Sequence, residues 1–276
     1  MLSLTTQRVL PGFRMSLGSS LLFIGIILIP PLTALLIQLA HMSWSQYWAV
    51  ITSPELIAAY KVTILSACVA SLFNAIFGML MAWILTRYRF PGRMLLDSLI
   101  DLPFALPTAV AGLTLATLFS TNGWYGSWLA QFGIQVSYTW LGITVAMAFT
   151  SIPFVVRTVQ PVLEELGSEF EEAAETLGAR RWQTFFYVML PELTPALLAG
   201  TALSFTRSLG EFGAVIFIAG NIAWKTEVTS LMIFIRLQEF DYPAASAIAS
   251  VILAVSLLLL LAIHVLQSRF GRRLGE

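Results

Sequence analysis

The feature that most constrains this chain is its series of long apolar runs, which few charged residues interrupt. A helix that crosses a bilayer needs about 20 consecutive apolar residues. Six segments reach that length, at residues 17–40, 61–86, 98–120, 139–162, 193–219 and 244–267. Of the 276 residues, 58% are hydrophobic and only 11% are charged, whereas soluble domains carry about 25% charged residues. The sequence therefore predicts an all-α integral membrane protein with six transmembrane helices.

Two apolar runs allow a second interpretation. Arg8 and Arg14 precede the first run, as in a secretory signal. The run is longer than the usual ~7–15 residues of such a signal, and no A-x-A cleavage site follows it, so we expect a permanent helix. The run Val228–Ile235 is too short to span a bilayer and lies among charged residues. We expect it to form an interfacial or re-entrant segment.

The distribution of Lys and Arg predicts the orientation, because cytoplasmic loops of membrane proteins carry an excess of both. The 15 basic residues divide unequally when both termini are placed in the cytoplasm. The cytoplasmic side then holds Arg8, Arg14, Arg87, Arg89, Arg93, Arg157, Arg180, Arg181, Arg269, Arg272 and Arg273. The outside or the membrane interior holds Lys61, Arg207, Lys225 and Arg236.

Several function classes lack their sequence signatures. The chain has no G-x-x-x-x-G-K-[ST], no H-E-x-x-H and no G-x-S-x-G, so we expect neither a cofactor nor catalysis by this chain alone. Cys68 is the single cysteine, and its apolar neighbours favour a small buried hydrophobe. His41 and His264 lie far apart in sequence, which argues against a metal site. The formal net charge of zero provides no field that would attract nucleic acid.

The most charged stretch of the chain, Glu171–Glu192, falls between the fourth and fifth predicted spans. Ser168 is a favourable N-cap, and Glu171 three residues later would complete a capping box. Gly178 can adopt the left-handed conformation that ends a helix. These signals predict a short cytoplasmic helix over Glu169–Leu177. A second amphipathic run follows at Trp182, Phe185, Phe186, Met189 and Leu190.

One face of this short helix is apolar, because Phe170, Ala173, Ala174 and Leu177 share the i, i+3, i+4, i+7 spacing. A helix of this length is not stable alone in water, so it must dock on a surface. The many glutamates around it argue against the anionic lipid of the inner leaflet. Packing on the chain's own loops and packing in a groove of a separate cytoplasmic protein are equally open on these physical grounds.

The segment EAAETLGARRWQTFFYVMLP resembles the cytoplasmic signature of ABC importer permeases, E-A-A-x3-G-x9-I-x-L-P. The matching positions are Glu172, Ala173, Ala174, Gly178, Val188 in the place of Ile, Leu190 and Pro191. In that family the segment is a coupling helix, which sits in a cleft of the ATP-binding subunit and transmits ATP-driven closure to the membrane helices. The resemblance implies the type I ABC importer architecture over residues 58–265, preceded by an added helix and outer loop within 1–57 and followed by a cytoplasmic tail at 266–276.

Within this family the chain most resembles the bacterial sulfate/thiosulfate permeases of the T/U subunit type. The segments that carry this resemblance are Leu85–Arg93, Asp101–Leu115, Ser151–Leu166 and Ser204–Asn221. It implies a non-catalytic inner-membrane subunit that works with two ABC ATPase subunits, a second related permease and an external solute-binding protein for sulfate or thiosulfate. A molybdate or tungstate permease shares several of these segments in looser form and stays an alternative, as does a self-sufficient secondary transporter.

Pro103 and Pro107 lie in the third predicted span and should kink it, because proline lacks an N–H and clashes with the preceding helical turn. Asp101 precedes them. Room for a neighbouring helix is left by Ala105, Ala109 and Gly112. Tight helix packing and a bent, gate-forming helix that lines the passage are equally open interpretations.

Arg207 and Glu211 are charged residues within the fifth predicted span, where each charge costs about 2.5–3.5 kcal/mol. Their i,i+4 spacing lets them pair on one face, and Gly210 and Gly213 loosen the helix beside them. We interpret the pair as a gate or packing switch in preference to a static lock. Contact between the Arg207 guanidinium and an oxyanion is a weaker alternative, because Glu211 would repel the anion.

The outer segment 221–243 has mixed charge. Its charged residues are Lys225, Glu227, Arg236, Glu239 and Asp241. A solvated loop would have the same composition. The resemblance favours a docking surface for the solute-binding protein, on which charges of both signs would fix the orientation of the partner.

Overall fold

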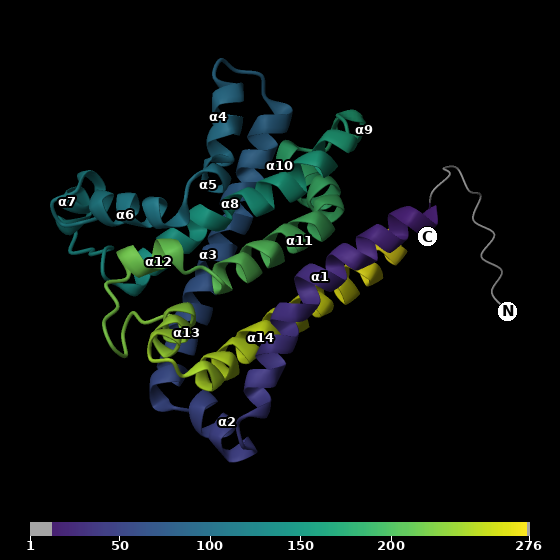
Figure 1. Ribbon diagram of the computed structural model, residues 1–276. Coiled ribbons are helices and arrows are strands. Elements are labelled where there is room, and N and C mark those ends of the chain that lie inside the picture. The colour runs from purple at the N-terminus through teal and green to yellow at the C-terminus, as the bar shows by residue number, and fades with distance from the viewer. Residues whose placement is uncertain (1–12, 275–276) are drawn as a thin grey trace.

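The computed structural model of this chain describes residues 13–274, so that Arg8 and the final two residues lie outside the described part. Every regular element within residues 13–274 is a helix (Figure 1). The elements in chain order are α1 (Phe13–Ala40), α2 (Trp44–Ile51), α3 (Pro54–Arg87), α4 (Arg93–Ile100), α5 (Leu102–Ala105), α6 (Thr108–Leu118), α7 (Trp124–Ala130), α8 (Trp140–Glu165), α9 (Glu169–Thr176), α10 (Arg181–Gln183), the π-helical η1 (Thr184–Met189), α11 (Leu190–Leu209), α12 (Gly213–Ile218), α13 (Thr229–Gln238) and α14 (Tyr242–Leu274).

Five of the six predicted spans coincide with long apolar helices. Helices long and apolar enough to cross a membrane are found at Met15–Ala40, Pro54–Arg87, Trp140–Glu165, Arg181–Leu209 and Tyr242–Ile263. These segments belong to α1, α3, α8, the continuous run from α10 to α11, and α14. The short run at Val228–Ile235 falls largely in α13, a helix of 10 residues that packs against α3 and α14.

The third predicted span is not one kinked helix, so this expectation is wrong. The chain forms α4, α5 and α6 in its place. Both prolines lie at helix starts, where a missing N–H costs least: Pro103 is in the first turn of α5 and Pro107 is the N-cap of α6. Leu106 between α5 and α6 is extended, with φ −83° and ψ 134°, which is the conformation that a following proline favours.

The fifth predicted span also ends earlier than expected. Helix α11 stops at Leu209 with Gly210 as its C-cap, and the chain becomes helical again only at Gly213, in α12. At its other end the helix starts earlier than expected, because α10 and η1 lead into it without interruption. The wide π-helical turns of η1 end two residues before Pro191, whose ring and missing N–H disfavour an ordinary α-helical turn there.

Helices α3, α8 and α11 form the centre of the molecule, and buried apolar side chains from all three fill the space between them. Helices α6 and α12 pack against each other on one flank, and α1 runs along α14 on the other (Figure 1). Helices α4 and α9 lie at the upper end of this view, whereas α2 and α13 lie at the lower end. The sequence segments predicted to face opposite sides of a membrane are therefore separated in space.

A buried polar cluster joins the three central helices. The Nδ2 of Asn74 in α3 donates to the Ser151 hydroxyl of α8 at 2.9 Å and to the Ser204 hydroxyl of α11 at 3.1 Å. It also donates to the Ala148 carbonyl at 3.0 Å, and the Ser208 hydroxyl donates to that of Ser151 at 3.1 Å. The four polar side chains have 0% exposure. Because lipid offers no competing partner, such bonds fix which helix faces meet.

We expect Asn74→Ala to destabilise the protein by about 1–2 kcal/mol, because it removes the donor shared by three helices and leaves buried hydroxyls with fewer partners. Thermal unfolding in detergent or nanodiscs measures this loss. Ser71→Ala is the matched control on the same helix, since Ser71 donates only to the Cys68 carbonyl of its own helix. Equal melting temperatures for the two variants would contradict a role of the cluster in holding the helices together.

Candidate functional site

Helix α9 is the short helix that the charged stretch predicted, and it ends one residue earlier than expected, at Thr176. Gly178 has φ +80°, which confirms the left-handed residue after the helix. The predicted capping box is wrong. Ser168 makes no side-chain bond to the backbone of α9, and its hydroxyl instead donates to Glu172 Oε1 at 2.7 Å. Glu171 is unavailable for the box because it pairs with an arginine from another helix.

The apolar side chains of α9 divide between the interior and the outside. Ala174 is buried against the chain's own residues, at 7% exposure, where α9 packs on η1. Leu177 is 88% exposed and Phe170 is 45% exposed, and Ala173 also faces outward. The helix therefore docks on its own chain through Ala174 and still presents an apolar outer surface. The structure thus confirms packing on the chain's own residues for Ala174, whereas docking of the outer side chains on a separate protein stays a prediction.

Arg87, the last residue of α3, holds the start of α9. Its Nε donates to Glu171 Oε1 at 2.8 Å, and its Nη1 donates to the Leu163 carbonyl of α8 at 3.1 Å. Its Nη2 donates to the carbonyl of Gly167, in the turn between α8 and α9. The guanidinium also lies over the ring of Trp83, with 5.8 Å to the centroid. No local spacing indicated these contacts, since the partners lie about 80 residues apart.

The second amphipathic run forms α10 and η1 and leads directly into α11. Met189 is buried at 1% exposure, and Phe185 packs edge-on against Trp83 of α3 with 5.4 Å between the ring centroids. Leu190 is half-buried and Pro191 is exposed at the start of α11. The second half of the segment Glu172–Pro191 is thus continuous with a long apolar helix.

The breaks in the third and fifth predicted spans meet in space. A Cβ added to Gly112 of α6 would clash with the backbone of Ala214 in α12, and a Cβ added to Gly213 would clash with Thr108. The prediction that small residues admit a neighbouring helix is therefore confirmed at Gly112. The alanines at 105 and 109 are exposed. Thr108 directly follows Pro107, so the start of α6 lies against the start of α12.

The Arg207–Glu211 pair forms as its spacing predicted, with 2.7 Å between Nη1 and Oε2. It forms across a helix end, because α11 stops two residues after Arg207. Glu211 is buried at 1% exposure and its Oε1 accepts the Ala214 N–H of α12 at 2.9 Å. The Glu211 carboxylate thus caps the start of α12 and pairs with Arg207 of α11. The Arg207 side chain keeps 33% exposure, so the guanidinium is partly open to the outside.

A second charge cluster, which the sequence analysis missed, attaches α4 and α5 to α8. Arg157 Nη2 lies 2.6 Å from Asp101 Oδ2 and its Nε lies 2.8 Å from Oδ1. Its Nη1 donates to Asp97 Oδ1 at 2.7 Å and to Gln160 Oε1 at 2.8 Å. A bidentate guanidinium–carboxylate pair of this kind fixes direction as well as distance. Three charged residues scattered over 60 positions gave no local signal of it.

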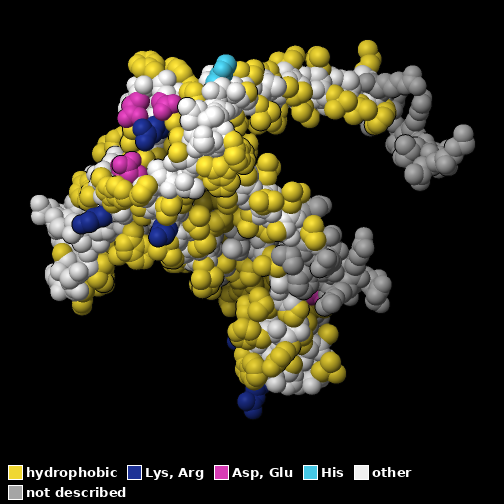
Figure 2. All heavy atoms as spheres, turned by 90° about the horizontal axis from the view of Figure 1, so that it is seen from below, with side chains coloured by type: hydrophobic (Ala, Val, Ile, Leu, Met, Phe, Trp, Pro, Cys, Tyr) yellow, Lys and Arg dark blue, Asp and Glu magenta, His cyan; other side chains and the backbone are white. Residues whose placement is uncertain are grey.

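The charged residues of segment 221–243 are partly engaged in contacts within the chain. Arg236 Nη1 lies 2.9 Å from Glu239 Oε2, and Asp241 Oδ1 accepts the Ala244 N–H at the start of α14. Lys225 is exposed. Figure 2, which looks at the molecule from below, shows acidic side chains in one region of a mostly hydrophobic surface and basic side chains beside them and at separate places. Glu239 and Asp241 are exposed as well.

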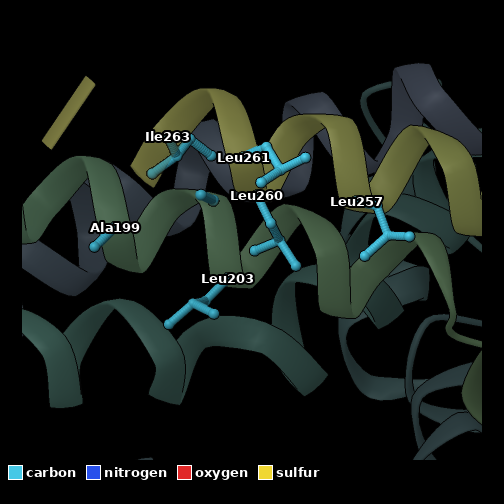
Figure 3. A pocket seen from close by; sticks show the side chains of 7 residues that line it. Ala199, Leu203, Leu257, Leu260, Leu261 and Ile263 are labelled. Carbon is cyan, nitrogen blue, oxygen red and sulfur yellow. The ribbon is translucent and has the colours of Figure 1, made fainter. Parts of the chain in front are cut away.

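An apolar groove of about 420 Å³ lies between α11 and α14 (Figure 3). Its lining consists of Ala199, Ala202, Leu203, Leu257, Leu260, Leu261 and Ile263. The groove offers no charged or hydroxyl group, so it lacks the donors that would recognise an anion. Among the described residues, no three His, Cys, Asp or Glu side chains gather as a metal site.

Cys68 corrects the expectation of a buried thiol, because it is exposed on α3. In a membrane protein the surface that faces lipid is as apolar as the core, so apolar neighbours in sequence do not indicate burial. His41 lies in the turn after α1 and His264 lies in α14.

Comparison with known proteins gives consistent matches along the chain. Residues 74–276 match the family described as "Binding-protein-dependent transport system inner membrane component". The chain is 79% identical over 273 residues to the sulfate transport system permease protein CysT of Escherichia coli (strain K12), covering 99% of both chains. It is 49% identical over 254 residues to the protein of the same description from a Synechocystis strain, covering 92% of this chain and 88% of the relative.

The fold is similar to those of membrane chains in solved ABC transporters. A crystal structure of a bacterial alginate ABC transporter in complex with its alginate-bound periplasmic protein superposes with a TM-score of 0.76 at 20% identity, covering 93% of each chain. The inward-facing MetNI methionine ABC transporter gives a TM-score of 0.61 at 16% identity, covering 83% of this chain and 99% of that chain. The chain therefore belongs to the binding-protein-dependent transport system inner membrane components, as a CysT-like ABC importer permease.

Proposed function

We propose that this chain is the membrane-spanning permease subunit of an ATP-driven importer of sulfate and thiosulfate in the bacterial inner membrane. The observation that carries the coupling to ATP is α9, whose Ala174 is packed inside while Leu177 stays 88% exposed at one end of the molecule. The anion comes from the relatives, because those that match along nearly the whole chain are described as sulfate transport permeases. The chain itself supplies transport and no catalysis.

The proposed topology has six spans with both termini in the cytoplasm. Five of the six spans are the long apolar helices. The remaining one, the third along the chain, is the broken segment α4–α5–α6. The distribution of basic residues supports this orientation, and α9 and α4 share one end of the molecule while α2 and α13 share the other. The first span and outer loop lie within 1–57, the transmembrane domain within 58–265 and a cytoplasmic tail within 266–276.

The proposed assembly contains two ABC ATPase subunits, a second related permease and an external solute-binding protein. The outer surface of α9, with Glu172, Ala173 and Leu177, docks in a cleft of an ATPase, and Gly178 ends the helix at that contact. Lys225, Arg236, Glu239 and Asp241 form the candidate docking surface for the solute-binding protein. Exposed apolar faces of α6 and α11 are available to the second permease, since their side chains include Val110, Leu113 and Leu203 at 41–56% exposure.

The proposed gate is the junction of the two broken helices. Pro107 is the N-cap of α6 and follows the C-cap of α5 at Leu106, and the Arg207–Glu211 pair bridges the gap between α11 and α12. Interrupted helices leave backbone groups that are stable in a membrane only inside protein or beside a water-filled passage. ATP-driven movement of α9 shifts α11 through η1 and opens or closes this junction.

The whole proposal is tested by reconstituting the chain with its ATPase, the second permease and the solute-binding protein in proteoliposomes. We expect uptake of labelled sulfate that requires both ATP and the binding protein. Unlabelled thiosulfate should reduce this uptake by competing with sulfate. Molybdate at the same concentration should compete weakly. Uptake without the ATPase would favour a secondary transporter. Strong competition by molybdate would show that sulfate is the wrong assignment and would favour a molybdate permease.

The coupling surface is tested by Leu177→Asp. Because Leu177 is 88% exposed, the substitution leaves the fold of this chain intact. It should lower sulfate-stimulated ATP hydrolysis about tenfold, as loss of an apolar anchor at a protein interface does. Leu177→Met is the matched control, since it keeps the volume and the apolar character. Equal stimulation in both variants at equal membrane levels would remove α9 from the ATPase contact.

The gate is tested by Arg207→Ala, Arg207→Lys and Glu211→Gln. If the pair controls the junction, Arg207→Ala and Glu211→Gln should each lower the maximal rate of uptake about tenfold, because each breaks an ion pair whose carboxylate is buried. The KM for sulfate should change little. A raised KM in Arg207→Ala alone would instead assign Arg207 to the anion. Unchanged uptake in all variants would remove the pair from transport.

A further inference from the structure

We infer that Arg87 is the positioning residue through which movement of α9 reaches α3 and α8. The inference rests on the proposed function, since it concerns how the coupling helix is connected to the membrane helices. Along the chain, α9 is joined to α8 by the turn at residues 166–168 and to α11 through α10 and η1. The Arg87 contacts add a non-covalent route to α3, which is not adjacent to α9 in the chain, and fix the turn that joins α9 to α8.

One guanidinium engages three separate parts of the protein. Arg87 belongs to α3, its Nε binds the Glu171 carboxylate of α9, and its Nη1 binds the Leu163 carbonyl near the end of α8. Its Nη2 binds the carbonyl of Gly167. The planar fork of arginine can satisfy these directions together, whereas the single ammonium of lysine acts as one point charge. The residue type is therefore part of the geometry.

The Gly167 contact fixes a turn that would otherwise be free to pivot. Gly167 has φ +59° and lies between the end of α8 at Glu165 and the start of α9 at Glu169. A glycine in this position leaves the direction of the following helix weakly determined by the backbone alone. With its carbonyl and Glu171 both held by Arg87, α9 keeps one direction relative to α3 and α8.

The pair of Arg87 and Glu171 is partly buried, unlike an ordinary surface pair. The side chains of Arg87 and Glu171 are 15% and 28% exposed. Exposed ion pairs contribute little because solvent screens them, and pairs away from solvent are screened much less. The adjoining Trp83 ring covers the guanidinium and also packs against Phe185 of η1. Trp83 therefore contacts Arg87, which gives the non-covalent route to α3, and η1, which gives the covalent route to α11.

The route continues through the centre of the molecule. Helix α3 has 34 residues and is unbroken from Pro54 to Arg87. Asn74, within α3, is bonded to Ser151 of α8 and Ser204 of α11. A displacement of Arg87 is thus carried along α3 into the polar cluster that joins all three central helices. The structure assigns α3, α8 and α9 to one moving unit.

The test uses the reconstituted complex and compares Arg87→Gln, Arg87→Lys and Glu171→Gln with the wild type. Two quantities are measured: the ratio of sulfate-stimulated to basal ATP hydrolysis, and the sulfate imported per ATP hydrolysed. Arg89→Gln is the matched control. Arg89 lies two residues after Arg87 and is exposed, so the substitution removes the same charge from a position outside the Arg87–Glu171 joint. The amount of ATPase that co-purifies reports assembly separately.

We expect Arg87→Gln and Glu171→Gln each to lower the sulfate imported per ATP about fivefold or more, which is the range of typical coupling between sites. Arg87→Lys should fall between Arg87→Gln and the wild type. The double variant Arg87→Gln with Glu171→Gln should be no worse than Arg87→Gln alone, since both changes break one joint. Co-purification of the ATPase should stay at the wild-type level in all variants.

The inference would be overturned if Arg87→Gln and Glu171→Gln both import as much sulfate per ATP as Arg89→Gln does. A loss of assembled complex with an unchanged ratio would also overturn it, because that pattern belongs to a purely structural role. If Arg87→Gln does not fold, Glu171→Gln decides, since it leaves the bonds from Arg87 to the two carbonyls in place. Failure of the wild-type complex to couple ATP to uptake would instead refute the proposed function.

Discussion

Lipid provides no hydrogen-bond partner for a backbone N–H or C=O, so the backbone groups at every interruption of a membrane helix must be satisfied by protein or by water in a passage. The contact between α6 and α12 depends on this constraint. Glu211 satisfies an N–H at the start of α12, and Arg207 balances its charge. Gly112 allows the two backbones to approach closely enough to exclude lipid. The charged pair, the glycines and the prolines are therefore parts of one solution, which allows two helices to be broken side by side.

The position of α9 also depends on partners within the protein. A helix as short as α9 has no stability of its own in water. It is held on one side by the burial of Ala174 and by Arg87, which binds the carboxylate of Glu171. Its outer side chains are left free because the inner ones are sufficient to fix it. A short helix fixed on one side can present an apolar surface to a partner without first being ordered by that partner, which reduces the entropic cost of binding.

Sequence reasoning predicted what depends on composition and on local spacing. The long apolar runs located five helices, the glycine after the acidic helix predicted a left-handed residue, and the i,i+4 spacing predicted the Arg207–Glu211 pair. It failed where the outcome depends on distant partners. Ser168 and Glu171 have the pattern of a capping box, but an arginine from α3 competes for the carboxylate. The prolines indicated a disturbance of the third span, but not that the helix would restart at Thr108 against a segment about 100 residues later in the chain. Whether Cys68 faces the core or the outside could not be predicted, because lipid and core are equally apolar.

The packing of α6 against α12 has a consequence for how the chain is made. Residues 108–118 leave the ribosome about 100 residues before residues 213–218, which cover them. Until then, α6 is about 16 Å long at 1.5 Å per residue and too short to span the hydrocarbon on its own. The nascent segment with its interrupted backbone must therefore be sheltered from lipid until the fifth span is synthesised. In that respect α6 reaches its final packing only after α12 has been synthesised.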